Sequence, residues 1–220
     1  MSVFDRIGGG AARLLLRAGF LRHAVRPPSP DQLAATEADL GRRLLAGLLR
    51  DHSLSRDPAA WDLLRRVRDL LRPALAARGL VFQPVALDLP GPLALALPGE
   101  HVVVTPAWLA QRGGSLKGLV FHLAALKALA ILRDSFQRCG SLSTRAIPSS
   151  PDILARLSGP PRLTETIFQA DRIALELCLA AGFGPDAALD ALAMSCVTSA
   201  PGPVTPSARI QRLRATLPAG

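Results

Sequence analysis

The 220-residue chain has no asparagine or tyrosine and very few cysteines or lysines. Its three cysteines, Cys139, Cys178 and Cys196, are odd in number and lack C-x-x-C spacing, so nothing favours a disulfide framework or a thiolate metal site. No internal repeat and no glycine-rich phosphate loop occurs. These absences favour a reducing compartment and argue against a nucleotide-binding loop.

Long uninterrupted apolar runs are also absent. The longest such stretch, residues 116–132, is broken by Lys117, His122 and Lys127, and it is short for a membrane span. A buried core helix is therefore expected there. We do not expect residues 3–25 to be a secretory signal, because Arg13 and Arg17 interrupt their apolar run. We expect a cytoplasmic protein, peripheral to a membrane at most.

Positive charge exceeds negative charge, with 26 Lys and Arg against 17 Asp and Glu, a net charge of +9. The excess is greatest in residues 1–78, and a GC-rich coding sequence would by itself enrich arginine. Residues 1–28 are expected to form a basic, partly amphipathic arm that ends in a proline-rich stretch. This arm either packs on the domain or contacts a membrane through residues 1–26; nucleic acid is the least favoured partner.

The whole chain is 49% apolar. The part that follows the arm, residues 29–220, is predicted to form a single domain. Apolar periodicity and capping residues predict long helices at 30–50, 59–77 and 116–133, and further helices at 151–157, 164–181, 185–195 and 206–217. Short apolar runs bounded by Pro and Gly at 81–89, 93–97 and 102–104 predict two or three strands. The predicted class is α+β, mainly helical, with a small β-sheet.

The order of four segments carries a family resemblance. Residues 93–100 read LALALPGE, residues 102–105 read VVVT, and His122 follows; residues 167–172 read IFQADR before a glycine stop, and residues 205–210 read TPSARI. From about residue 57 to the end, this order resembles the HtpX-like gluzincin zinc metallopeptidases. The resemblance implies a metallopeptidase-like domain with a peptide-binding cleft.

The resemblance also implies that the zinc site is degenerate. Active members carry H-E-x-x-H, in which two histidines on one helical face hold zinc and the glutamate activates water. Here His122 matches the first ligand, but Leu123 replaces the glutamate, Leu126 the second histidine and Ile167 the third ligand. Asp171 matches a residue that supports the site. One imidazole does not hold zinc, so we expect no catalytic residue, no metal and no cofactor.

The aliphatic replacements predict how the former site is filled. Leu123, Leu126 and Ile167 are expected to pack in one buried cluster beside His122 and Asp171. We expect a hydrogen bond between His122 and Asp171, with pairing of Asp171 to a nearby arginine as the open alternative. Cys178 and Cys196 lie on apolar helical patterns and are expected to be buried and inert.

The leading functional prediction is a pseudopeptidase that binds a protein or peptide segment in the former substrate cleft. An edge strand would hold an extended peptide by backbone pairing, and the strand expected to do so is Val102-Val103-Val104-Thr105. The resemblance implies that Thr205 and Arg209 also belong to the substrate cleft. One alternative is an active zinc endopeptidase with ligands rearranged to His101, His122 and Glu165. The other is a basic membrane- or nucleic-acid-associated module based on residues 1–78.

Four further polar residues are predicted to be ordinary surface groups. His101 and Glu100 are expected to be exposed at the start of a strand, and His23 and His52 to be exposed in the basic first third of the chain.

Overall fold

A computed structural model describes residues 29–112, 114–140, 142, 147–159, 161, 163–198 and 204–217, without the side chains of 194–198. The predicted arm at 1–28, and with it His23, lies outside this range, as does the side chain of Cys196. The elements, in chain order, are α2 (Pro30–Asp51), α3 (Pro58–Ala76), β1 (Gln83–Ala86), β2 (Ala94–Ala96), β3 (His101–Val104), α4 (Pro106–Arg112), α5 (Leu116–Ile131), α6 (Asp134–Cys139), α7 (Ser150–Leu157), α8 (Thr164–Ala180), α9 (Pro185–Thr198) and α10 (Pro206–Arg214). The predicted mainly helical α+β class with a small sheet is confirmed.

The helices begin where capping residues predict. Ser29 forms a capping box with Gln32 at the start of α2, and the Asp57 side chain accepts a hydrogen bond from the backbone of Ala59 at the start of α3. Both helices have proline at their first position. Helix α3 continues through Pro73 as one helix to Ala76.

The sheet has the strand order β1-β3-β2, which places β3 in the centre. Strand β3 is parallel to β1 and antiparallel to β2. The prediction that Val102, Val103, Val104 and Thr105 form an edge is therefore wrong. Each of these four residues is fully buried, and a continuous apolar run of this kind is typical of a strand covered on both faces.

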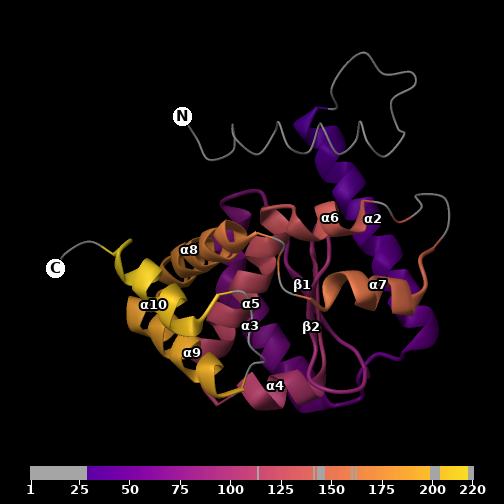
Figure 1. Cartoon of the computed structure of the whole chain (residues 1–220). Coiled ribbons are helices and arrows are strands. Elements are labelled where there is room, and N and C mark those ends of the chain that lie inside the picture. Colours follow the sequence, from indigo (N-terminus) through magenta and orange to yellow (C-terminus); the bar gives the residue numbers. More distant parts are fainter. Residues whose placement is uncertain are drawn as a thin grey trace.

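Helices cover both faces of this sheet (Figure 1). The side chains of Val102 and Val104 join one apolar cluster with α3, α5, α8 and α9, whereas Val103 joins a second cluster with α2 and α7. This alternation follows from the two-residue period of a strand. Helix α5 is buried between α3, α8 and α9, which confirms the predicted core helix.

A buried polar cluster joins the end of α5 to α2. Lys127 is 2% exposed, and its Nζ donates a hydrogen bond of 2.7 Å to the carbonyl oxygen of Gly99. Glu37 forms an ion pair with Arg133, with 2.6 Å between Oε1 and Nε. Gly99 has φ of +78°, and a Cβ at this position would lie 2.9 Å from the Cα of Ala38. The turn between β2 and β3 thus packs directly on α2 and requires glycine.

His101 belongs to the same region. It is 7% exposed, so the prediction of an exposed histidine is wrong, and its neighbour Glu100 is half-buried. The cause is its place on the central strand, between Gln83 of β1 and Leu97 at the end of β2.

Lys127 predicts an unusual dependence of stability on pH. Burial lowers the pKa of Lys127 to about 8, while Glu100 and Glu37 partly oppose this effect. Between about pH 8 and the ordinary lysine value of 10.5, the unfolded chain binds a proton that the folded chain has released, so stability rises with pH. We expect the parent to gain up to about 3 kcal/mol relative to Lys127→Met across this window, measured by urea unfolding. Equal pH profiles for both proteins would contradict the assignment.

Candidate functional site

A cavity of about 400 Å³ lies where the C-terminal end of α4 and the N-terminal ends of α5 and α9 meet. Its polar lining includes Gln111, Arg112, Lys117, His122, Asp186 and Asp190. Helices α5 and α9 lie close together at Gly118, where a Cβ would make an ordinary van der Waals contact with the Cβ of Ala191 at 3.6 Å. Of these polar residues, only His122 was predicted from the sequence as part of a site.

His122 is a half-buried, neutral imidazole at the wall of this cavity. Its ring makes edge contacts with Trp108 and Phe121, with centroids 6.3 and 6.1 Å away. Burial, followed by the nearby charges of Arg112 and Arg209, lowers the pKa of His122 to about 3, and a hydrogen bond to the backbone of Ala191 opposes this shift. The side chain therefore carries no charge at neutral pH.

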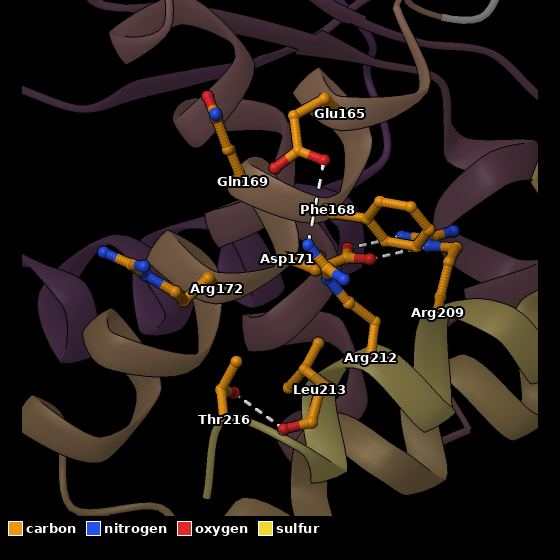
Figure 2. A pocket seen from close by; sticks show the side chains of 9 residues that line it. All are labelled: Glu165, Phe168, Gln169, Asp171, Arg172, Arg209, Arg212, Leu213 and Thr216. Atoms are coloured by element: carbon orange, nitrogen blue, oxygen red, sulfur yellow. Dashed lines mark hydrogen bonds and ion pairs between the residues drawn. The ribbon is translucent and has the colours of Figure 1, made fainter. Parts of the chain in front are cut away.

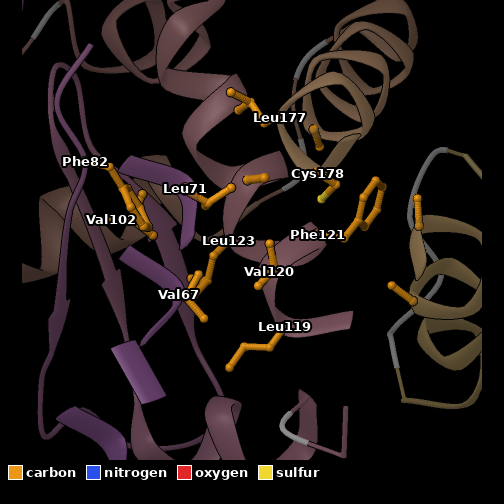
Figure 3. Close-up of a cluster of buried hydrophobic side chains, with 14 of the residues drawn as sticks. Val67, Leu71, Phe82, Val102, Leu119, Val120, Phe121, Leu123, Leu177 and Cys178 are labelled. Atoms are coloured by element: carbon orange, nitrogen blue, oxygen red, sulfur yellow. The ribbon is translucent and has the colours of Figure 1, made fainter. Parts of the chain in front are cut away.

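The other positions of the predicted zinc site do not line this cavity. Leu123 is fully buried and lies with Val67 and Leu71 on the side of α5 that faces α3 (Figure 3). Leu126 is half-buried and packs against the same cluster. Ile167, half-buried on α8, belongs to none of the apolar clusters in the described part of the chain, so the expected packing of all three side chains is only partly realised.

The described residues do not fit a zinc ion. None of them form a group of three or more His, Cys, Asp and Glu side chains that could hold a metal. In particular, Glu165 is exposed and faces Arg212 at 4.0 Å, so the alternative cluster with His101 and His122 does not form.

Asp171 pairs with Arg209, and the expected hydrogen bond between Asp171 and His122 is wrong. The Arg209 guanidinium donates to both carboxylate oxygens, at 2.8 and 2.6 Å (Figure 2). Asp171 is 1% exposed; burial raises its pKa, and the guanidinium partly opposes this shift. This ion pair joins α10 to α8. Thr205 is the N-terminal cap of α10. The alternative prediction, that Asp171 pairs with a nearby arginine, is correct.

The two outer strands of the sheet differ in how many unpaired backbone N–H and C=O groups their outer edges carry. On β1, Pro84 has no N–H, and the carbonyl oxygen of Ala86 accepts a hydrogen bond of 2.9 Å from the backbone of Ser55. This edge is therefore closed to a further strand over much of its length.

The β2 edge has backbone groups that are not paired by any described residue, although Ala96 is only 7% exposed. Leu97 N–H bonds to His101, and Thr105 N–H bonds to Leu93, so the odd-numbered residues of this strand face β3. By the alternation of an antiparallel ladder, Ala94 and Ala96 direct their N–H and C=O groups away from the sheet. No described residue is hydrogen-bonded to these outward groups, and Ala94 is the more accessible of the two.

Two remaining polar predictions have mixed outcomes. Cys178 is fully buried, and burial raises its pKa to about 12, which confirms an inert thiol. His52 is half-buried rather than an ordinary surface residue, and its Nε2 lies 2.8 Å from the Ser150 hydroxyl.

No family model matches the chain, and no curated protein matches it either. The likeness to HtpX-like peptidases therefore stays a prediction. None of the helices in the described ranges combines the length and apolar content needed to cross a bilayer.

Proposed function

We propose that the protein is a non-catalytic, metallopeptidase-like domain that binds an extended protein or peptide segment along β2. The observation that carries this proposal is the outer side of β2, where no described residue is hydrogen-bonded to the outward N–H and C=O of half-buried Ala94. An added strand would gain main-chain hydrogen bonds there without any metal. The predicted edge strand was β3, whereas the proposed one is β2. The mode of binding, backbone pairing with an extended peptide, is the same in both.

The start of β2 is connected to His122 through α4. The hydroxyl of Thr105 accepts hydrogen bonds from Leu93 N–H at 3.0 Å and from Trp108 N–H at 3.2 Å, which ties the start of β2 to α4. The Trp108 ring in turn contacts the His122 ring.

Cleavage of the bound segment is not part of the proposal. Peptide hydrolysis by a zinc enzyme requires a bound metal and a base that activates water. Leu123, at the position of that base, is buried in the apolar core, and the described residues offer no ligand set. Binding without hydrolysis is the function that these residues support.

Substitution of Ala94 tests the binding mode. Ala94→Pro removes the outward N–H and leaves the β2–β3 ladder intact, whereas Ala94→Val keeps the N–H and serves as the matched control. On an array of random decapeptides tethered through their N-termini, the parent should bind a subset of sequences. Fluorescence anisotropy with those decapeptides should show that Ala94→Pro lowers the binding affinity by about tenfold or more. The proline removes one hydrogen bond to the bound strand, and its ring blocks the edge.

Ala94→Val should bind within about twofold of the parent, since the backbone groups persist. Circular dichroism should show that both variants are folded. The proposal fails if the parent binds no decapeptide on the array, or if folded Ala94→Pro binds as well as the parent.

A further inference from the structure

The apolar stripe by which α8 packs on the core extends to the very start of this helix. Its buried members follow one another at helical spacing and are Ala170, Ala174, Leu177 and Cys178. Ile167 lies three residues before Ala170 and Leu163 four residues before Ile167, so both continue the same face. The exposed fraction rises along this face from 3% at Ala170, through half-buried Ile167, to 64% at Leu163.

This first part of the stripe has no apolar partner among the described residues. Leu163 is the most exposed large apolar side chain in the described part of the chain. Neither Leu163 nor Ile167 belongs to an apolar cluster there. Ala170 packs with Ala128 and Leu132 at the C-terminal end of α5, so α5 ends where the uncovered part of the stripe begins.

The residue type at position 163 is locally unfavourable. Leu163 occupies the N-cap of α8 and makes no side-chain cap hydrogen bond, and leucine is among the poorest N-cap residues. Helices α2, α3, α5, α7 and α10 instead begin with a side-chain cap, from Ser29, Asp57, Ser115, Ser149 and Thr205. Helix capping does not account for a leucine here, whereas an apolar contact does.

The N-terminal arm, residues 1–28, joins the domain near this end of α8. It leads into α2, and Glu37 of α2 pairs with Arg133, the residue after Leu132, at 2.6 Å. Ser29 precedes Glu37 by eight residues, about 12 Å along a helix. Fifteen residues of the arm can span up to about 50 Å, so its apolar part can reach the uncovered stripe.

Composition and size favour this arm as the occupant. Residues 14–21 contain one charge, Arg17, and five large apolar residues, Leu14, Leu15, Leu16, Phe20 and Leu21. Two uncovered side chains are far fewer than the 20–30 residues a side of a typical stable interface between separate proteins. A segment tethered to the same chain needs less contact area, because its effective concentration is already high.

We infer that residues 14–21 of the arm pack on the start of α8, against Leu163 and Ile167 of the same chain. This contact buries apolar surface of both parts and covers the stripe to its end. It selects packing on the domain over membrane contact for the arm. The inference does not depend on the proposed binding of a peptide along β2.

Trypsin tests the contact, because Arg13 and Arg17 place cleavage sites at and within the apolar segment. We expect Leu163→Ser in the full chain to be cleaved there at least about fivefold faster than the parent, since cleavage follows the undocked population. Mass spectrometry of the released peptides measures both rates. Serine is a favourable N-cap, so α8 should stay folded in this variant, which circular dichroism checks.

Leu179→Ser supplies the matched control on the same helix. Leu179 is 45% exposed, and its spacing places it on the opposite face of α8 from Leu163. Its replacement should leave the cleavage rate at Arg13 and Arg17 unchanged. The slower cleavage of the parent should also persist over about a fiftyfold range of protein concentration, because the contact lies within one chain.

Equal cleavage rates for the parent and folded Leu163→Ser would overturn the inference. Protection that disappears on dilution would overturn it in favour of a contact with a second copy. Protection that appears only with vesicles of phosphatidylcholine and phosphatidylglycerol, equally in both proteins, would overturn it in favour of a membrane contact.

Discussion

Leu123→Glu, which would place a glutamate as in the pattern H-E-x-x-H, is expected to destabilise the protein by about 4 kcal/mol or more and to confer no peptidase activity. Leu123 is fully buried between α5 and α3, in a cluster with Val67 and Leu71. His122 lines the cavity, but the adjacent position on the helix points into this core instead. The new carboxylate would therefore be desolvated without a counter-charge.

Urea unfolding followed by circular dichroism measures the effect, with Leu123→Met as the matched control. A volume-conserving apolar change should cost less than about 1.5 kcal/mol. The loss in Leu123→Glu should also be smaller at pH 5 than at pH 8, because burial raises the pKa of a carboxyl and protonation removes its charge. A stable Leu123→Glu protein that cleaves peptides would contradict the described core.

Asp171→Ala should destabilise the protein by about 3 kcal/mol, because it leaves the guanidinium of Arg209 without its carboxylate. The Arg209 side chain is 23% exposed and gains some hydration after the change. The expected loss of stability is therefore at the lower end of the range for broken buried ion pairs. The pair joins α8 to α10, so the loss should come with weaker attachment of α10.

The double variant Asp171→Ala, Arg209→Met supplies the control for this pair. It removes both charges and should recover much of the stability lost in the single variant, since no unpaired charge remains. The measurement is again urea unfolding at pH 7. A double variant as unstable as Asp171→Ala alone would show that the pair is not the cause.

The elements of the fold were predictable because their signals are local. Ser29 and Asp57 mark helix starts by hydrogen bonds within one turn, and the apolar run of α5 predicts burial by composition alone. The strands at 83–86 and 94–96 fall within the predicted runs, and the third strand, 101–104, begins one residue before the run predicted at 102–104. Helix α6, which follows Arg133 at φ of 62°, was not predicted because it is short and has no side-chain cap.

The arrangement of the sheet and site could not be predicted in the same way. Which strand is central depends on the crossover that brings β3 between β1 and β2, and this is a property of the whole chain. The partner of Asp171 is Arg209, 38 residues further along, and only packing of α10 on α8 decides that contact. Arg112 and Lys117 carry no motif, although they flank a helix start near His122.

Metal content tests the central claim most directly. Elemental mass spectrometry of the purified, tag-free protein, beside a His122→Ala variant, should find far less than one zinc per chain in both. About one zinc per parent chain, lost on replacement of His122, would show that this histidine is still a ligand and would contradict the account of a non-catalytic domain.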